Sequence, residues 1–118
     1  SFTELVDVYP TLCEIANIDA PDYIQGKSLI PVLEDPTKTL KDEVYSRYKE
    51  GEAVIDKDYS YTEFFNGEAY LGNMLYDLQV DLKQNIDISK LPENAELVDK
   101  YSEKLKVMRA KVNINPFE

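Results

Sequence analysis

One stretch of this chain separates a strand-rich part from a helical part, and it limits the folds that the chain can adopt. The stretch runs from Gly72 to Asn85. Its apolar side chains alternate with their neighbours, at Met74, Tyr76 and Leu78. Alternation with a period of two predicts a strand that places one face on a core. The polar run from Asp81 to Asp87 then predicts a turn that leads toward a helix.

Three shorter segments before this stretch also predict strands. They are Glu43–Tyr48, Ala53–Asp56 and Tyr59–Phe65. The third segment is rich in aromatic residues, which suit a half-buried pleated surface. The connecting loops are short, including a predicted hairpin loop at Lys49–Glu52, and short loops favour antiparallel pairing. The sequence therefore predicts a four-stranded antiparallel sheet within residues 43–78.

The last segment, residues 92–112, predicts a helix. Pro92 suits a first turn, and basic residues crowd the final turns, as the helix dipole favours. Apolar side chains recur three or four positions apart, at Leu97, Val98, Tyr101, Leu105, Met108 and Val112. This amphipathic stripe predicts that the helix covers one face of the sheet, which gives an α+β fold.

Residues 1–17 predict a further helix, whose surface is apolar over most of its circumference. Its polar side chains form one narrow stripe, at Glu4, Asp7, Thr11, Glu14 and Asn17. A helix that packs through one face needs an apolar stripe only about 100° wide. We therefore expect the polar stripe to face water. The excess apolar surface should dock on a larger partner or pair with a second copy in a homodimer.

The charge balance excludes two classes of partner. The 118 residues include 13 Lys and Arg against 23 Asp and Glu, which gives a net charge of -10, and no basic stripe stands out. Nucleic acid and anionic membrane surfaces would be repelled, so we expect neither as a partner. The longest apolar runs are also too short to span a bilayer. A chain of this length fits one domain.

Residue types that usually carry catalysis are scarce. The chain has no histidine, which removes the commonest general base and metal ligand. The single cysteine, Cys13, lies on an apolar helix face and is predicted to be a small buried hydrophobe. A set of side-chain oxygens could suggest calcium, at Asp77, Asp81, Asn85 and Asp87. Their spacing lacks the glycine and terminal glutamate of an EF-hand loop, so they predict turn and cap chemistry, and no metal site is expected.

Several phrases resemble the sulfatase family, in the same order along the chain. Leu75–Asn85 reads LYDLQVDLKQN and resembles the family phrase LYDLxxDPxExxN. Glu4–Ala16 followed by Gln25–Leu29 is similar to VDxxPTLLxLAG and GxSLxPxL. Tyr45–Tyr48 and Asp58–Glu63 resemble the FSQY and DxRYTEW segments of the iduronate-sulfatase branch. The resemblance covers nearly the whole chain.

The resemblance implies the C-terminal subdomain of an arylsulfatase-type enzyme, whose first helix belongs to the larger alkaline-phosphatase-like sulfatase fold. Such enzymes use a formylglycine made within a C/S-x-P-x-R motif and a divalent cation, expected to be calcium. That motif is absent from this chain. The catalytic residues should therefore lie upstream, and the fragment alone should be inactive. Its implied role is to support the missing catalytic domain and to form one wall of the substrate cleft, in a periplasmic or secreted enzyme.

Arg47 and Lys49 are the candidates for contact with a substrate. They form a cationic pair beside Tyr45 and Tyr48 at a strand end. In a sulfatase, such a pair would suit an anionic sugar at the rim of the pocket, and an ordinary solvated strand edge is the alternative. For the whole chain, the alternative is a free-standing acidic α+β module that binds another protein through its first helix.

Overall fold

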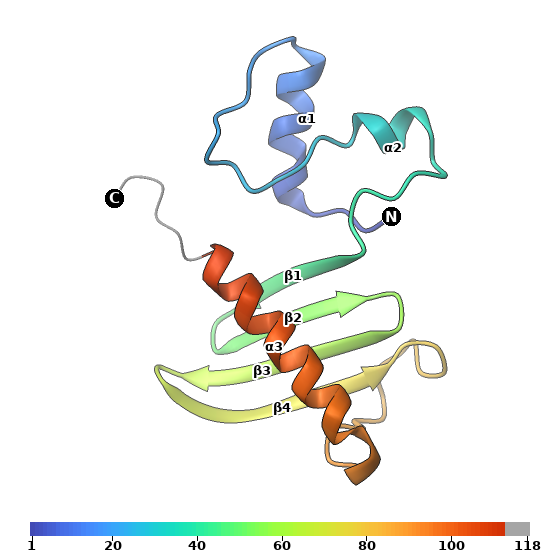
Figure 1. Cartoon of the computed structure of the whole chain (residues 1–118), viewed down its shortest axis with the longest axis vertical. Coiled ribbons are helices and arrows are strands. Elements are labelled where there is room, and N and C mark those ends of the chain that lie inside the picture. The colour runs from blue at the N-terminus through green and yellow to red at the C-terminus, as the bar shows by residue number, and fades with distance from the viewer. Residues whose placement is uncertain (113–118) are drawn as a thin grey trace. The chain divides into compact units, whose positions relative to one another are not determined.

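The computed structural model describes residues 1–112, which belong to two compact units. The first unit comprises Ser1–Val44, and the second begins at Tyr45 and contains most of the sheet and the last helix. Figure 1 shows the elements of each unit. The predicted α+β fold is confirmed, with its four-stranded antiparallel sheet, its C-terminal helix and an additional N-terminal helix. Within residues 1–112, no helix is both long enough and apolar enough to cross a membrane.

The sheet is built in chain order, so each strand pairs with the next. The strands are β1 (Glu43–Tyr48), β2 (Gly51–Asp56), β3 (Tyr59–Asn66) and β4 (Ala69–Asp77). Their order matches the predicted sheet, and two of them begin earlier than expected.

Tight turns explain the earlier starts of β2 and β4. The turn before β2 contains only Lys49 and Glu50, because Lys49 adopts a left-handed conformation with φ of 51°. The turn before β4 begins with Gly67, which has φ of 61° and reverses the chain directly after β3. Both turns are therefore shorter than the sequence predicted.

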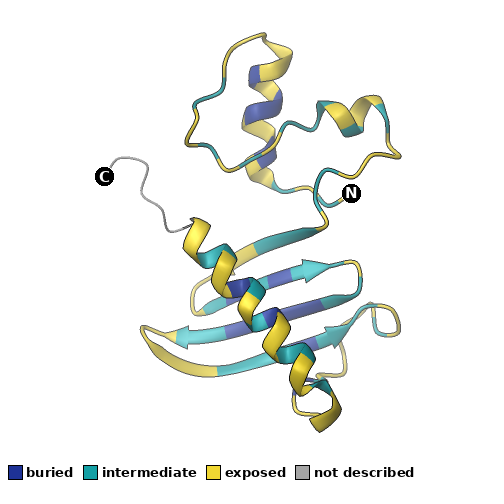
Figure 2. Cartoon of the chain, in the orientation of Figure 1, coloured by how far each residue is buried: buried dark blue, intermediate teal, exposed yellow. Residues whose placement is uncertain are grey.

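The core of the second unit lies between the sheet and α3 (Ala95–Val112), which follows a short 3-10 helix, η2 (Pro92–Asn94). Its buried side chains are Val54, Tyr61, Leu75, Tyr101 and Leu105. Three more residues of the predicted helical stripe pack against them, namely Leu97, Val98 and Met108. Figure 2 shows buried segments of the middle strands beneath α3. The predicted stripe is thus confirmed as far as Met108, and the side chain of Val112 lies outside the described residues.

The first unit contains a shorter and less regular helix than predicted. A 3-10 helix, η1 (Leu5–Asp7), leads into α1 (Val8–Ile15), so the helix does not extend over residues 1–17. Pro10 lies in the first turn of α1, where its missing N–H needs no partner within the helix. A second short helix that was not predicted, α2 (Ile30–Glu34), follows.

Part of the polar stripe on η1 and α1 is buried rather than exposed. Asp7 is fully buried and Thr11 nearly so, whereas Leu5 and Leu12 are 90% and 58% exposed. The expectation that Asp7 and Thr11 face water is therefore wrong. Both side chains are covered by a loop whose backbone N–H groups they bind. The predicted burial of Cys13 is confirmed.

Candidate functional site

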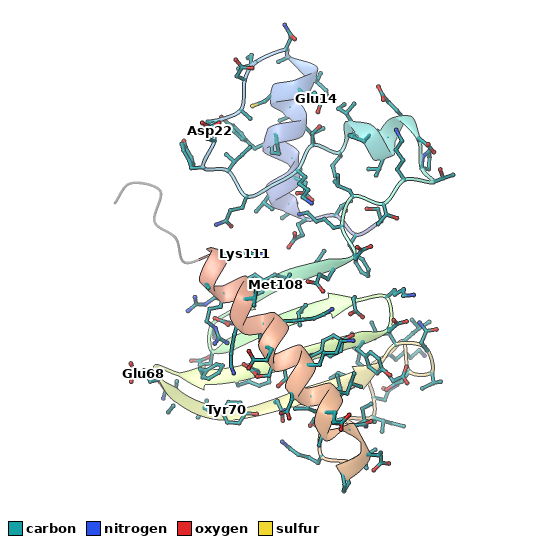
Figure 3. The ribbon with its side chains drawn as sticks, viewed as in Figure 1. Glu14, Asp22, Glu68, Tyr70, Met108 and Lys111 are labelled. Atoms are coloured by element: carbon teal, nitrogen blue, oxygen red, sulfur yellow. The ribbon has the colours of Figure 1, made fainter. Side chains whose placement is uncertain are left out.

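A groove of about 550 Å³ lies at the end of the sheet where the β1–β2 and β3–β4 turns meet the C-terminal half of α3. Arg47, Lys49 and Glu68 contribute exposed charges to its lining, and Phe65 and Arg109 contribute more covered surface. Figure 3 shows Glu68 at the tip of the hairpin that joins β3 and β4. The groove therefore combines charged and aromatic groups from three separate parts of the second unit.

Arg109 from α3 joins two buried carboxylates at this groove. Its Nε donates to Glu52 Oε2, and its Nη2 donates to Glu63 Oε2 at 3.3 Å. Glu52 and Glu63 lie directly opposite each other on β2 and β3 and are only 5% and 3% exposed. The guanidinium also lies over the ring of Phe65, 4.7 Å from its centroid. Burial lowers the pKa of Arg109, but both carboxylates outweigh this effect and raise the pKa above its usual value.

A tyrosine hydroxyl extends this ionic cluster across the sheet. The hydroxyl of Tyr61 donates to Glu63 Oε1 at 3.0 Å and accepts a hydrogen bond from Asn73 Nδ2 at 3.3 Å. Burial and the neighbouring charge of Glu63 raise the pKa of Tyr61, so the phenol stays neutral. Among the described residues, no buried side-chain nitrogen or oxygen lacks a hydrogen-bond partner. The charge of Arg109 is thus compensated within the cluster, which suits a fixed platform rather than an anion site.

The structure brings the two predicted contact residues, Arg47 and Lys49, to the same groove. The side chain of Arg47 is 55% exposed, and its Nε lies 3.5 Å from Glu52 Oε1. Lys49 is exposed in the tight turn, with Nζ 5.4 Å from the centroid of the Tyr48 ring. Both cations are exposed at the groove, whereas Arg109 is engaged with its two carboxylates. Their contact with a substrate remains a prediction.

The sequence reading missed Glu52, Glu63 and Arg109. The burial of the two carboxylates could have been predicted from their spacing along the strands. Glu52 stands two positions from the core residue Val54, and Glu63 stands two positions from the core residue Tyr61. Side chains two positions apart in a strand share a face, so both carboxylates had to point under the covering helix. A buried carboxylate requires a cationic partner, and Arg109 is that partner.

The sequence of nearly the whole chain matches a known family. The family described as N-sulphoglucosamine sulphohydrolase, C-terminal, matches residues 1–111. The chain belongs to this sulfatase family. An arylsulfatase from Clostridium perfringens is 30% identical over 81% of the chain, and a Delta 4,5-hexuronate-2-O-sulfatase from Bacteroides thetaiotaomicron is 30% identical over 79%. The chain covers only 20% and 21% of these relatives, and it corresponds to the C-terminal domain of a sulfatase-family member.

Solved structures share the fold of this sulfatase domain. One is a protein in complex with its substrate D-glucosamine-2-N,6-O-disulfate, with a TM-score of 0.80, 24% identity, and coverage of 93% of this chain and 24% of that chain. Another is the phosphonate monoester hydrolase of Agrobacterium radiobacter, with a TM-score of 0.77, 23% identity, and coverage of 93% and 25%. These likenesses support the fold assignment.

Sulfatase membership implies a metal ion and a formylglycine in the parent enzyme, and the residues that the structure describes fit neither group. Within residues 1–112, no group of three or more His, Cys, Asp or Glu side chains could hold a metal ion. Ile15 stands two positions after Cys13, where the C/S-x-P-x-R motif requires proline, and no serine has a proline two residues later. No catalytic step is therefore assigned to this domain.

The carboxylates of Asp81 and Asp87 bind backbone N–H groups of their turns and of the neighbouring strand β4. Asp81 Oδ2 accepts from the N–H groups of Asn85 and Ile86, at 2.6 and 2.8 Å. Asp87 Oδ1 accepts from the N–H groups of Leu75 and Ser89, at 3.0 and 2.9 Å. The prediction of turn and cap chemistry is thus confirmed for this segment.

Proposed function

We propose that this chain serves as the C-terminal domain of a sulfuric ester hydrolase, in which it braces the catalytic domain and forms one wall of the substrate cleft. The catalytic residues would lie upstream. The observation that carries this proposal is the apolar outer surface of η1 and α1. Leu5, Leu12 and Ile15 are 90%, 58% and 64% exposed, although they lie on an ordered helical segment. Apolar side chains gathered in this way are typical of a contact surface.

The polar side of the same helical segment is fixed in place by the following loop. Asp7 Oδ1 accepts from the N–H of Lys27 at 2.9 Å and from Lys41 Nζ at 2.7 Å. Thr11 Oγ1 accepts from the N–H of Leu29 at 2.9 Å. The loop passes so close to η1 that a Cβ on Gly26 would lie 1.9 Å from the carbonyl oxygen of Val6. The apolar side is consequently left for another surface, which supports docking on the catalytic domain.

The groove beside β1 supports the second part of the proposal. Arg47 and Lys49 offer positive charge above the compensated Arg109 cluster. The names of the curated relatives, an arylsulfatase and a hexuronate sulfatase, support a sulfated and negatively charged substrate for the parent enzyme. Arg47 and Lys49 would contact the anionic groups of that substrate, most simply those of a sulfated sugar. The divalent cation, expected to be calcium, and the formylglycine would belong to the catalytic domain.

The same apolar surface suits the rival function, a free-standing acidic module that binds another protein. The reading frame upstream of Ser1 separates the two functions. Continuation into a C/S-x-P-x-R motif supports the sulfatase, and its absence would rule out the sulfatase proposal. The 118-residue chain alone should not hydrolyse aryl or sugar sulfates, with or without calcium. Metal-dependent turnover that copurifies with the chain would contradict the placement of catalysis upstream.

The role of the groove is tested in the full-length parent enzyme. Removing the charge of Arg47 or Lys49 by substitution with alanine should raise KM for a sulfated sugar roughly tenfold, because one charge-assisted contact is lost. Lys57→Ala is the matched control, since Lys57 is an exposed lysine in the turn between β2 and β3. An unchanged KM in both groove variants would exclude this groove from the substrate cleft.

A further inference from the structure

The sheet of the second unit has two chemically different faces. The face under α3 carries Glu52, Asp56 and Glu63, which are all bound by side chains of α3. Alternate residues of β2, β3 and β4 point the other way, and direct cross-strand partners share that face. They include Ala53, Ile55, Thr62, Phe64, Met74 and Tyr76, which we call the uncharged sheet face.

The uncharged sheet face is unusual for this chain, in which 31% of all residues are charged. The residues of β2 to β4 that share this side are uncharged from Gly51 to Ile55, from Ser60 to Phe64 and from Gly72 to Tyr76. The hydroxyl of Tyr76 donates to Met74 Sδ at 3.2 Å, so this polar group finds its partner within the face. A surface of this composition suits a contact from which water is excluded.

No helix in the described part of the second unit covers this face. The two helices of the unit are η2 and α3, and α3 packs on the opposite side, against Val54, Tyr61 and Leu75. Figure 1 shows α3 crossing one side of the sheet only. The six side chains of the uncharged sheet face are only partly buried. A sheet with an apolar face normally packs that face against another layer.

We propose that the catalytic domain of the same parent chain packs against the uncharged sheet face. This inference rests on the proposed function, and it names a second docking surface besides η1 and α1. The curated relatives are about four times as long as this chain, which covers 20% and 21% of them, so most of the parent chain is available as the covering layer. Covalent attachment gives that layer a high effective concentration at the face, which a second copy of the chain lacks.

The two methionines of the chain provide a test. Met74 lies on the uncharged sheet face, and Met108 lies on α3 and packs against the core. Figure 3 labels Met108 on its helix. The full-length parent enzyme and the 118-residue chain are treated with dilute hydrogen peroxide, and sulfoxide at each methionine is followed by mass spectrometry. Oxidation of Met74 relative to Met108 should be at least fivefold slower in the parent than in the dilute 118-residue chain.

A charged variant sharpens the same experiment. Thr62→Lys places a charge at the centre of the face, opposite Met74 in the register, and should return the oxidation ratio of the parent to that of the short chain. Glu103→Lys, on the exposed side of α3, is the matched control and should leave the ratio unchanged. The comparison of the two unmodified chains needs no variant, so it stands if Thr62→Lys fails to fold.

Three results would overturn the inference. One is an equal oxidation ratio in the parent and the short chain. Another is protection of Met74 in the short chain that grows with concentration, which would identify a second copy as the cover. The third is full protection in the dilute short chain, which would identify its own first unit. An upstream C/S-x-P-x-R motif together with any of these results would leave the proposed function intact and reject only this docking surface.

Discussion

The helical segments of the two units bury opposite kinds of side chain. In α3, the apolar residues Tyr101 and Leu105 are buried and Lys106 is exposed. In η1 and α1, Asp7 and Thr11 are buried and Leu12 is 58% exposed. Both segments show apolar residues at helical spacing. Spacing therefore identifies the stripes of a helix, and the surface that covers the helix decides which stripe is buried.

The two covering surfaces need different side chains from the helix that they cover. α3 lies on side chains of the sheet, Val54, Tyr61 and Leu75, which need an apolar partner. η1 and α1 are covered by a loop, whose N–H groups at Lys27 and Leu29 have no strand or helix partner and need acceptors. An unpaired buried N–H costs about 1 to 3 kcal/mol, so polar side chains are preferred beneath a loop.

The largest expected effect comes from placing a charge in the core beneath α3. Leu105→Asp should unfold the second unit, because Leu105 is fully buried and no cation is available to pair with the new carboxylate in the core cluster. Lys106→Ala, at the next position on the exposed side of the helix, should leave the thermal midpoint nearly unchanged. Equal circular dichroism melts for the two variants would show that the buried face is wrongly assigned.

The polar core of the first unit should be nearly as sensitive. Asp7→Ala leaves the largely covered Lys41 ammonium with one carboxylate, Glu4, in place of two, and it leaves the N–H of Lys27 without its acceptor. Breaking a buried pair in this way costs about 3 to 5 kcal/mol. The expected result is rapid amide hydrogen exchange at Lys27 and Leu29, with normal protection in the sheet. Glu14→Ala, on the exposed side of α1, should leave that exchange unchanged.

Acid should weaken both units through two carboxylates, Asp7 and Asp56. Burial raises the pKa of Asp7, but hydrogen bonds from Lys41 and from the N–H groups of Lys27 and Glu4 outweigh it, so the pKa falls below 3.8. The pKa of Asp56 is lowered in the same way, against burial, chiefly by the hydroxyl of Tyr101.

A carboxylate whose pKa is lower in the folded state stabilises the protein above its unfolded pKa. That stabilisation is lost as the pH falls below about 4 and through the folded pKa. Thermal melts between pH 6 and pH 2.5 should therefore show falling midpoints. Carbon-13 titration of the two carboxylates should place both midpoints below the ordinary pKa of an aspartate side chain. Unshifted titration of Asp7 would contradict the buried ion pair.

The smallest effect on stability is expected on the outer surface of η1 and α1. Leu12→Glu should change the free energy of unfolding by less than about 0.5 kcal/mol, because Leu12 is already exposed. It should nevertheless change association. We expect the isolated chain to form a two-fold dimer through this surface and Leu12→Glu to shift it toward monomer in sedimentation equilibrium. Thr39→Glu, at an exposed polar position outside η1 and α1, is the control, and a wild-type chain that stays monomeric at high micromolar concentration would refute the dimer.

Much of the second unit was predictable because its pattern is local. Alternation placed β1 to β4, and the three- and four-residue spacing of Tyr101, Leu105 and Met108 placed the covered face of α3. The turns were misjudged because they depend on single left-handed residues, Lys49 and Gly67, which periodicity does not reveal.

The candidate site was predictable only at its rim. Arg47 and Lys49 stood out as cations beside aromatic residues in sequence. Arg109 meets Glu52 and Glu63 only after the sheet and α3 are assembled, across sequence separations of 57 and 46 residues. The burial of Asp7 was unpredictable for the same reason, because its partner Lys41 lies 34 residues away.

The 34-residue separation between Asp7 and its partner Lys41 affects the order of events during synthesis. A short helix forms within about a microsecond, whereas the ribosome adds roughly 5 to 20 residues per second. Roughly two to seven seconds therefore separate the addition of Asp7 from that of Lys41, 34 residues later. During that interval the polar side of the nascent η1–α1 segment lacks its Lys41 partner, and its apolar side is exposed. We expect this part of the newborn chain to be a preferred target for chaperones until Lys41 emerges and closes the unit.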